Sequence, residues 1–245
     1  MIRTLLVALA AAASTLFYGG RAIIASLLGR RGAFYSELTR GWARLILRGS
    51  GCPVVVHGIE NVLPGTARVI ASNHVSWFDV FAIASVVPGQ YAFVAKKELE
   101  RIPIFGSAWK AAGHVSIDRS DRSRAIASLR QAGEIIRAQE SSVIIFPEGT
   151  RSRTGRLQPF KKGAFMLAVE ARVPVVPTVV IGSYDIMRPD DWKVRPSTIH
   201  IYFCEPIASD GAGDCAEELV DRVRARIASV LAETESLPPL ECTPS

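Results

Sequence analysis

A histidine and an aspartate lie five positions apart in the stretch SNHVSWFD, residues 72–79. This stretch follows the β-branched run ARVIAS and precedes the apolar run VFAIASVV, which predicts a strand that ends near Ser72 and a helix that begins near Ser76. Within one regular helix, side chains at this spacing would point about 140° apart. His74 and Asp79 can therefore meet only if His74 lies on the turn and Asp79 lies in the first helical turn.

The spacing alone leaves two interpretations of this pair open. In the catalytic one, the Asp79 carboxylate orients the His74 imidazole, and the second ring nitrogen can take a proton from a hydroxyl group. In the structural one, Ser76 and Asp79 form a capping box at the start of the helix. The structural interpretation accounts for Ser76 and Asp79 but gives no reason for Asn73 and His74.

Arginines gather after two other expected strands. The loop FPEGTRSRTG, residues 146–155, follows the apolar run SVII and carries Arg151. The stretch GHVSIDRSDRSR, residues 113–124, supplies Arg119. Ligands of parallel α/β sheets bind at the carboxyl ends of the strands. Exposed loop arginines are commonly just solvated, but two that converge at one sheet edge suit a phosphate group, which guanidinium binds through two parallel hydrogen bonds.

Short β-branched runs alternate with helix-like segments from residue 53 onwards. The expected strands are 53–58, 67–72, 91–95, 114–118, 142–147, 173–182 and 198–203, and the expected helices are 76–87, 104–112, 122–140, 161–171 and 214–233. This alternation predicts an α/β fold, in which a mostly parallel mixed sheet is covered by helices on both faces.

The composition fits one catalytic domain with an anionic partner. The 245 residues are 49% apolar, which can supply a sizeable core. The formal net charge of +6 favours nucleic acid, phosphorylated metabolites or an acidic membrane surface, without choosing among them. The cysteines lack CxxC or metal-ligand spacing, so neither disulfides nor a metal site is expected. They are Cys52, Cys204, Cys215 and Cys242.

The N-terminal segment has the composition of a membrane anchor. Residues 4–18 carry no charge, Gly19, Gly20 and Arg21 interrupt them, and a second apolar piece follows at 22–28. As a helix the first piece spans about 22 Å, short of the roughly 30 Å hydrocarbon core. We therefore expect a broken helical anchor in one leaflet. A cleaved signal peptide and a spanning signal-anchor are the alternatives.

The stretch RGWARLILR, residues 40–48, places Trp42 among Arg40, Arg44 and Arg48. This mixture suits a lipid headgroup interface, and an ordinary solvated helix is the alternative. The turn GSGCP that follows predicts a boundary. The expected parts are membrane-associating helices at 1–50, an α/β catalytic domain at 51–236 and a disordered tail at 237–245.

Four short motifs occur in an order typical of one enzyme family. They are NHx4D at residues 73–79, GHVSIDR at 113–119, FPEGTR at 146–151 and VPVVPTVV at 173–180. This ordered set resembles the glycerolipid acyltransferases, the family of 1-acylglycerol-3-phosphate acyltransferases. Ile117 departs from the family, in which an aromatic residue is often found at this position. The stretches KKEL, IPIFG and KKGA, the last at residues 161–164, are also similar to family sequence.

The resemblance implies transfer of an acyl group from acyl-CoA or an acyl-carrier protein to the free hydroxyl of lysophosphatidic acid, which gives phosphatidic acid. Glycerol 3-phosphate or another lysolipid is the alternative acceptor. His74 would be the general base and Asp79 its orienting partner, while Arg119 and Arg151 would hold the acceptor phosphate. The turn and nearby lysines would complete the substrate site: Glu148, Gly149, Thr150, Lys96, Lys97 and Lys162.

The implied reaction also sets expectations for the surroundings. Attack on the thioester creates an oxyanion, and backbone amides between Glu148 and Thr150 or near Ser76 are candidates to receive it. No metal or cofactor is required, because the thioester is a co-substrate. The acceptor lies in the bilayer and the donor arrives from the cytosol, so the expected location is the inner membrane with the site facing the cytoplasm.

Three other classes fit less well. A serine hydrolase could use Ser76 with His74 and Asp79, but the chain has no GxSxG nucleophile elbow. A non-catalytic lipid-binding membrane protein would need the arginines and the anchor but not His74. Nucleic-acid binding is supported only by the net charge, because no basic and aromatic stripe crosses an expected sheet face.

Overall fold

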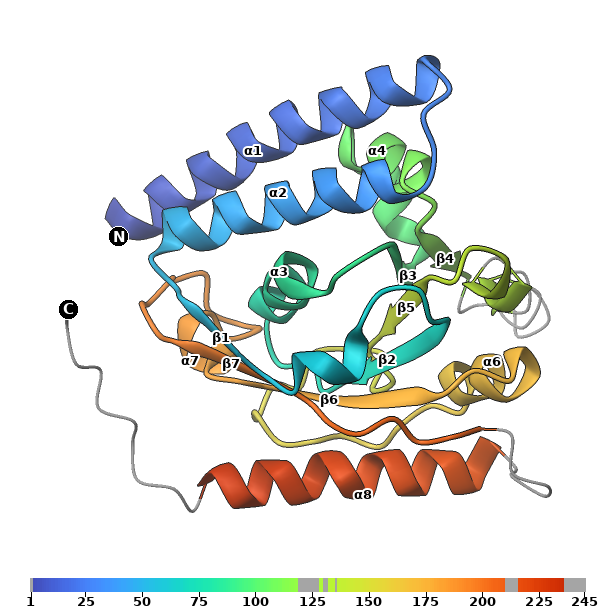
Figure 1. Ribbon diagram of the computed structural model, residues 1–245. Helices are drawn as coiled ribbons and strands as arrows, with labels where there is room; N and C mark the ends of the chain where they lie inside the picture. The colour runs from blue at the N-terminus through green and yellow to red at the C-terminus, as the bar shows by residue number, and fades with distance from the viewer. Residues whose placement is uncertain (1, 119–127, 130–131, 135, 210–215, 236–245) are drawn as a thin grey trace.

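The computed structural model describes residues 2–118, 128–129, 132–134, 136–209 and 216–235 (Figure 1). Within these residues, seven strands form one sheet in the order β1-β7-β6-β2-β5-β3-β4. The strands are β1 (Val54–His57), β2 (Arg68–Ser72), β3 (Tyr91–Lys96), β4 (Val115–Ile117), β5 (Ser142–Ile145), β6 (Val175–Ile181) and β7 (Ile199–Phe203). Only β6 and β7 pair antiparallel, so the mostly parallel mixed sheet is confirmed.

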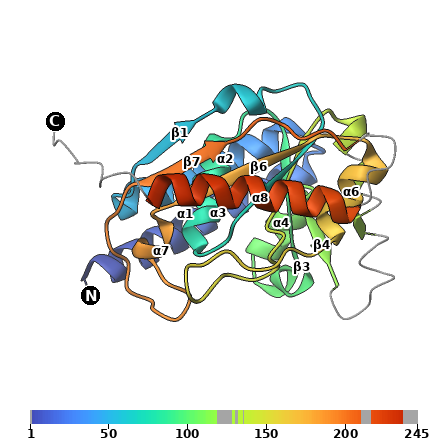
Figure 2. The same cartoon turned by 90° about the horizontal axis from the view of Figure 1, so that it is seen from below.

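Helices cover both faces of this sheet. They are α1 (Ile2–Leu27), α2 (Ala33–Ser50), α3 (Trp77–Val86), α4 (Phe105–Ala111), α6 (Gly163–Ala171), α7 (Ser183–Ile186) and α8 (Ala216–Glu235), with 3-10 turns η1 (Ile59–Val62) and η2 (Lys97–Arg101). Side chains alternate along a strand, so Ile70 of β2 packs towards α2 and α3, whereas Val69 packs towards α6 and α8. Figure 2 shows α8 crossing the sheet on the face opposite α1 and α2.

The first helix is continuous, which corrects the expected break at Gly19, Gly20 and Arg21. A glycine inside a helix costs only about 1 kcal/mol relative to alanine. At Gly19, close packing of α1 against its neighbours leaves no room for a larger side chain. A Cβ on Gly19 would lie 2.8 Å from Cγ2 of Ile104, and one on Gly41 of α2 would lie 2.7 Å from the Tyr18 ring. These glycines therefore let α1 pack closely against α2 and α4.

The stretch at residues 40–48 turns only partly towards the protein, so the headgroup interpretation is wrong for the buried Arg40 and stays a prediction for the exposed arginines. Arg40 is buried, and its Nη2 donates to the carbonyl oxygens of Val87 at 2.7 Å and Gly89 at 2.9 Å. The indole Nε1 of Trp42 donates to Thr15 Oγ1 at 3.0 Å. Arg44 donates from Nε to the Ser85 carbonyl oxygen at 3.0 Å, but its side chain is exposed, as is that of Arg48.

The expected division into parts and the expected tail are not tested by the described residues. The division into parts at 1–50 and 51–236 stays a prediction, although α2 does end at Ser50. The tail expected at 237–245 lies outside the described residues, and the helix expected at 122–140 lies partly outside them.

Arg40→Leu should lower the free energy of unfolding by about 2 to 4 kcal/mol, because it leaves two carbonyl oxygens without their donor. Urea unfolding of the full chain in detergent measures this. The matched control is Arg48→Leu on the exposed face of α2, expected to change stability by about 0.5 kcal/mol or less. Equal losses in both variants would contradict the assignment.

Candidate active site

The turn between β2 and α3 is fixed by Asn73. Its side chain replaces a strand residue: Nδ2 donates to the Val180 carbonyl oxygen at 2.9 Å, and Oδ1 accepts from the Val180 amide at 2.8 Å. Because β6 is a central strand, this pair ties the end of β2 to the rigid middle of the sheet. Asn73 therefore positions the residue that follows it, His74.

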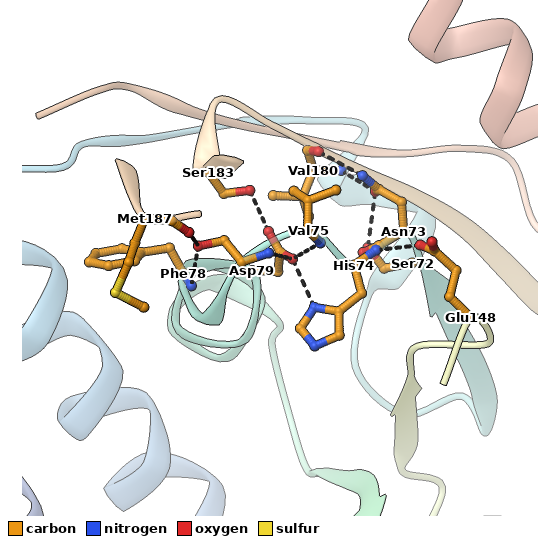
Figure 3. Close-up of polar contacts among 11 residues, drawn as sticks. Ser72, Asn73, His74, Val75, Phe78, Asp79, Glu148, Val180, Ser183 and Met187 are labelled. Atoms are coloured by element: carbon orange, nitrogen blue, oxygen red, sulfur yellow. Dashed lines mark hydrogen bonds and ion pairs between the residues drawn. The ribbon is translucent and has the colours of Figure 1, made fainter. Parts of the chain in front are cut away.

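His74 and Asp79 meet as the spacing allowed (Figure 3). Nδ1 of His74 lies 2.8 Å from Oδ2 of Asp79, whose carboxylate is buried. The same oxygen accepts from the amides of Val75 at 2.7 Å and Ser76 at 2.9 Å, and Ser183 Oγ donates to Oδ1. The capping box is also present. The two interpretations of this pair thus describe one arrangement, in which Asp79 both caps α3 and orients His74.

The contact assigns the tautomer of His74. A carboxylate can only accept, so Nδ1 carries a proton, and in the neutral imidazole Nε2 then has the lone pair. In Figure 3 the second ring nitrogen points away from Asp79. The Phe146 ring stacks on the imidazole with centroids 4.1 Å apart, which limits rotation of the ring. His74 is therefore arranged to accept a proton through Nε2.

Glu148 holds His74 through its backbone. Oε1 accepts from the His74 amide at 2.6 Å, and Oε2 accepts from the Gln158 amide at 3.0 Å. Burial raises the pKa of Glu148 to about 7, and the charge of Asp79 adds to this shift, while the two amide donors oppose it. Both carboxylate oxygens are thus occupied by backbone amides, and Glu148 positions the histidine.

His74 opens onto a cavity of about 600 Å³. Gly149, Thr150, Arg151 and Lys96 line the same cavity, so the structure brings these expected residues together. Gly149 adopts a φ of +77°, which favours glycine at this turn. The rest of the wall is mainly apolar and comes largely from α1, α2, α3, β3 and α4.

Two basic residues line the cavity, Arg151 and Lys96, and Arg151 is held in place by an aromatic ring. The Cζ of Arg151 lies 5.1 Å from the centroid of the Trp77 ring, a cation–π contact that fixes the guanidinium beside α3. Burial lowers the pKa of Arg151, and Asp79 and Asp190 oppose the shift. His114, which also lines the cavity, adds no charge near neutral pH, because burial lowers the pKa of this imidazole to about 4.

Other expected residues lie elsewhere. Lys162 forms an ion pair with Glu217 of α8 and is not part of the cavity wall. Lys97 lies 3.8 Å from Asp118. Arg119 falls outside the described residues. The structure therefore does not bring Lys162 to the site.

Two of the amides expected to receive an oxyanion are already engaged. The Ser76 amide donates to Asp79, and the Gly149 amide donates to the Phe146 carbonyl oxygen at 3.0 Å. Ser76 Oγ donates to the Met187 carbonyl oxygen at 2.7 Å and accepts from the Phe78 amide at 3.3 Å, so it is a helix cap.

Sequence reasoning missed Ser183. This buried hydroxyl donates to Asp79 Oδ1 from the first residue of α7. A serine after a glycine at the end of a strand is an ordinary turn signal, and its partner lies 104 positions away in the chain. No local pattern could have paired them.

Comparison with known proteins identifies the family. The family model described as Acyltransferase matches residues 53–181, which include His74, Asp79 and the FPEGTR loop. The chain belongs to the acyltransferase family. The family expected from the four motifs is confirmed.

This acyltransferase is similar in sequence to several enzymes named 1-acyl-sn-glycerol-3-phosphate acyltransferase. It is 31% identical to the 1-acyl-sn-glycerol-3-phosphate acyltransferase of Saccharomyces cerevisiae over 99% of this chain and 80% of the yeast chain. It is 37% identical to the enzyme of that name from Cocos nucifera over 78% of this chain, and 34% identical to the human alpha enzyme over 75%. The chain spans 60% of the coconut protein and 65% of the human one.

A solved structure resembles this acyltransferase over nearly its whole length. The crystal structure of the 1-acyl-sn-glycerophosphate (LPA) acyltransferase from Thermotoga maritima superposes with a TM-score of 0.80 and 28% sequence identity. The match covers 98% of this chain and 97% of the Thermotoga chain. The N-terminal helices are therefore included in the similarity.

The raised pKa of Glu148 predicts a pH-dependent stability. The folded chain keeps a proton that the unfolded chain, with an ordinary value of 4.5, has released. The free energy of unfolding should therefore fall as the pH rises from 4.5 to about 7. Glutamine does not titrate, so Glu148→Gln lacks this pH-dependent contribution. The difference in the free energy of unfolding between the wild type and Glu148→Gln should therefore change between pH 4.5 and about 7. A constant difference from pH 4 to 8 would contradict the shifted pKa.

Proposed function

We propose that this acyltransferase moves a fatty acyl group from a thioester to the free hydroxyl of a 1-acylglycerol 3-phosphate, which gives phosphatidic acid. The observation that carries the proposal is the His74–Asp79 pair, whose second imidazole nitrogen serves a cavity that also holds Arg151. The names of the yeast, coconut and human relatives and of the Thermotoga structure support this acceptor. Glycerol 3-phosphate and other lysolipids remain the alternative acceptors.

The chemistry follows from the assigned tautomer. Nε2 of His74 takes the proton of the acceptor hydroxyl as its oxygen attacks the thioester carbonyl carbon. The tetrahedral intermediate then collapses: the carbon–sulfur bond breaks, the ester remains, and the thiolate takes the proton from the imidazolium. The buried Asp79 carboxylate stabilises that imidazolium. No covalent acyl-enzyme and no metal or other cofactor is needed.

The cavity walls support an amphipathic substrate. Arg151, stacked on Trp77, offers a guanidinium fork for the acceptor phosphate, and Lys96 adds a second cation to the wall. Beyond them the aromatic and aliphatic wall residues suit acyl chains. Acyl-CoA and an acyl-carrier protein remain alternative donors. Arg119 remains a candidate for the phosphate, and Glu148 is assigned to positioning instead of glycerol binding.

The N-terminal helix supports attachment in one leaflet. Among the described residues, α1 is long and apolar enough to cross a membrane, and its 26 residues span about 39 Å. However, α1 packs against α2 and α4, and α2 packs on α3, so a span would draw the catalytic part into the bilayer. An in-plane helix avoids this and buries the exposed apolar stripe. The stripe consists of Ile2, Leu5, Leu6, Leu9, Leu16, Phe17, Ile24 and Leu27.

We place the enzyme on the inner membrane with its site facing the cytoplasm, where a lipid acceptor and a thioester donor meet. The in-plane helix replaces the broken anchor of the sequence prediction and keeps its one-leaflet geometry. The membrane surface is thus a partner of the chain.

If His74 is the general base, His74→Ala should reduce turnover by at least about 100-fold, because general-base catalysis contributes roughly 10² to 10⁴. The measurement is release of thiol from acyl-CoA in the presence of lysophosphatidic acid. His57→Ala, on the exposed end of β1, is the matched control and should retain wild-type turnover. A folded His74→Ala variant with near-wild-type turnover would refute the mechanism.

If Arg151 binds the phosphate, Arg151→Ala should raise the KM of lysophosphatidic acid roughly 10- to 100-fold, the effect of one lost charge-assisted contact. The KM of the donor should change little. Arg153→Ala removes a nearby exposed arginine that pairs with Asp190, and serves as the control. A monoacylglycerol acceptor provides the second test, because equal losses with and without a phosphate would contradict this role.

A further inference from the structure

An exposed tryptophan lies beside the N-terminal end of α1. Trp192 has 82% of its surface exposed, comparable with Ile2 at 79%, whereas Trp109 is 6% exposed and Trp77 is 37% exposed. It belongs to the loop at residues 187–198, between α7 and β7. A large aromatic side chain left in water is unusual, because indole burial is among the larger apolar contributions to binding. The exposure of Trp192 therefore suggests a partner.

The loop around Trp192 is held in place. The Val194 amide donates to Thr4 Oγ1 of α1 at 3.1 Å, and the Val194 side chain is buried. Nη2 of Arg195 lies 2.6 Å from Oδ2 of Asp191, whose Oδ1 accepts from the Lys193 amide at 2.9 Å. Figures 1 and 2 both show this loop next to the N-terminal end of α1. Trp192 thus lies on a loop that is ordered by hydrogen bonds and by an ion pair, and one of these hydrogen bonds joins the loop to the proposed membrane helix.

The same loop is hydrogen-bonded to the start of α3, beside the turn that carries His74. It begins at Met187, whose carbonyl oxygen accepts from Ser76 Oγ at the start of α3. Ser183, one turn earlier, donates to Asp79. The loop and α7 are therefore hydrogen-bonded to the start of α3, next to the turn that carries His74. This connection distinguishes the loop from other exposed apolar positions such as Leu63, at 58% exposure.

The charges of the loop suit an anionic surface. Residues 187–198 contain Arg188, Lys193 and Arg195 against Asp190 and Asp191. Both carboxylates already have arginine partners, since Asp190 lies 3.6 Å from Arg153 Nε and Asp191 pairs with Arg195. An indole with neighbouring cations is the combination that favours the headgroup layer of a bilayer.

We propose that Trp192 and its loop form a second lipid contact, in which the indole enters the headgroup layer of an anionic bilayer beside the first turns of α1. The inference rests on the proposed one-leaflet attachment of α1. A single in-plane helix leaves the protein able to rotate about the helix axis. A contact from a separate element removes that freedom, which fixes the height of the His74 cavity relative to the lipid acceptor.

Vesicle binding of the full-length protein tests the contact. With phosphatidylcholine vesicles that contain phosphatidylglycerol, Trp192→Ser should weaken partitioning roughly 10-fold, the loss of one partly buried aromatic side chain. Lys193→Glu should weaken binding to these vesicles and leave binding to pure phosphatidylcholine unchanged. Leu63→Ser removes an exposed apolar side chain near η1 and should bind as the wild type.

Depth and chemistry are measured separately. Quenching by brominated lipid should be larger in the wild type than in Trp192→Phe, because that variant lacks the interfacial indole. Turnover of a water-soluble short-chain acceptor should be unchanged in Trp192→Ser, whereas turnover of vesicle-bound lysophosphatidic acid should fall. Loss of the soluble reaction as well would overturn the contact role.

The outcomes separate this inference from the proposed function. If Trp192→Ser partitions like the wild type while Leu5→Ser in α1 is released, the loop contact is wrong and the attachment by α1 stands. If the wild type does not bind vesicles, the membrane attachment fails and the inference fails with it. If Trp192→Ser instead dissociates a dimer in size-exclusion chromatography, the surface belongs to a second copy and the lipid contact is rejected.

Discussion

The buried carboxylate of Asp79 is the interaction on which the site depends. It accepts four hydrogen bonds, from the His74 imidazole, the amides of Val75 and Ser76, and the Ser183 hydroxyl. A charge excluded from water is tolerated only when such donors replace its hydration. The requirement fixes three pieces of chain at once: the turn after β2, the first turn of α3 and the start of α7. One side chain thus supplies the helix cap, the tautomer of the histidine and the junction between distant segments.

The turn that carries His74 is also held from the other side. Its amide and carbonyl groups bond to Glu148 and Ser152 in the loop after β5, and Asn73 bonds to β6. A base that must reach a hydroxyl at hydrogen-bond distance gains from such support, because misplacement by about 1 Å can cost two orders of magnitude in rate. Glu148, which would otherwise be assigned to the substrate, is therefore engaged in holding His74.

The N-terminal hairpin, α1 and α2, belongs both to the cavity and to the proposed membrane contact. Its two helices form part of the apolar cavity wall, and the opposite side of α1 carries the exposed stripe. The close contacts at Gly19 and Gly41 are needed for this double role, since a larger residue at either position would push α1 away from α4 or α2. The proposed lipid attachment and the cavity wall consequently share one element, so a change in the packing of α1 would alter both.

The sequence by itself determined the seven strands, the mostly parallel sheet and the His74–Asp79 pair, because each depends on local periodicity or on spacing across one turn. It also determined the family, whose motifs are contiguous short strings. The tertiary structure alone decided what depends on distant partners. Ser183 reaches Asp79 across 104 positions, Lys162 turns to Glu217 of α8, and Arg40 turns inward to carbonyl groups of the loop after α3. The continuity of α1 was also decided there, because close packing against Ile104 and α2 outweighs the weak intrinsic preference of two glycines. Spacing along a chain carries no information about which distant carbonyl, carboxylate or ring a side chain will meet. That physical limit separates the features predictable from the sequence from those that only the tertiary structure decided.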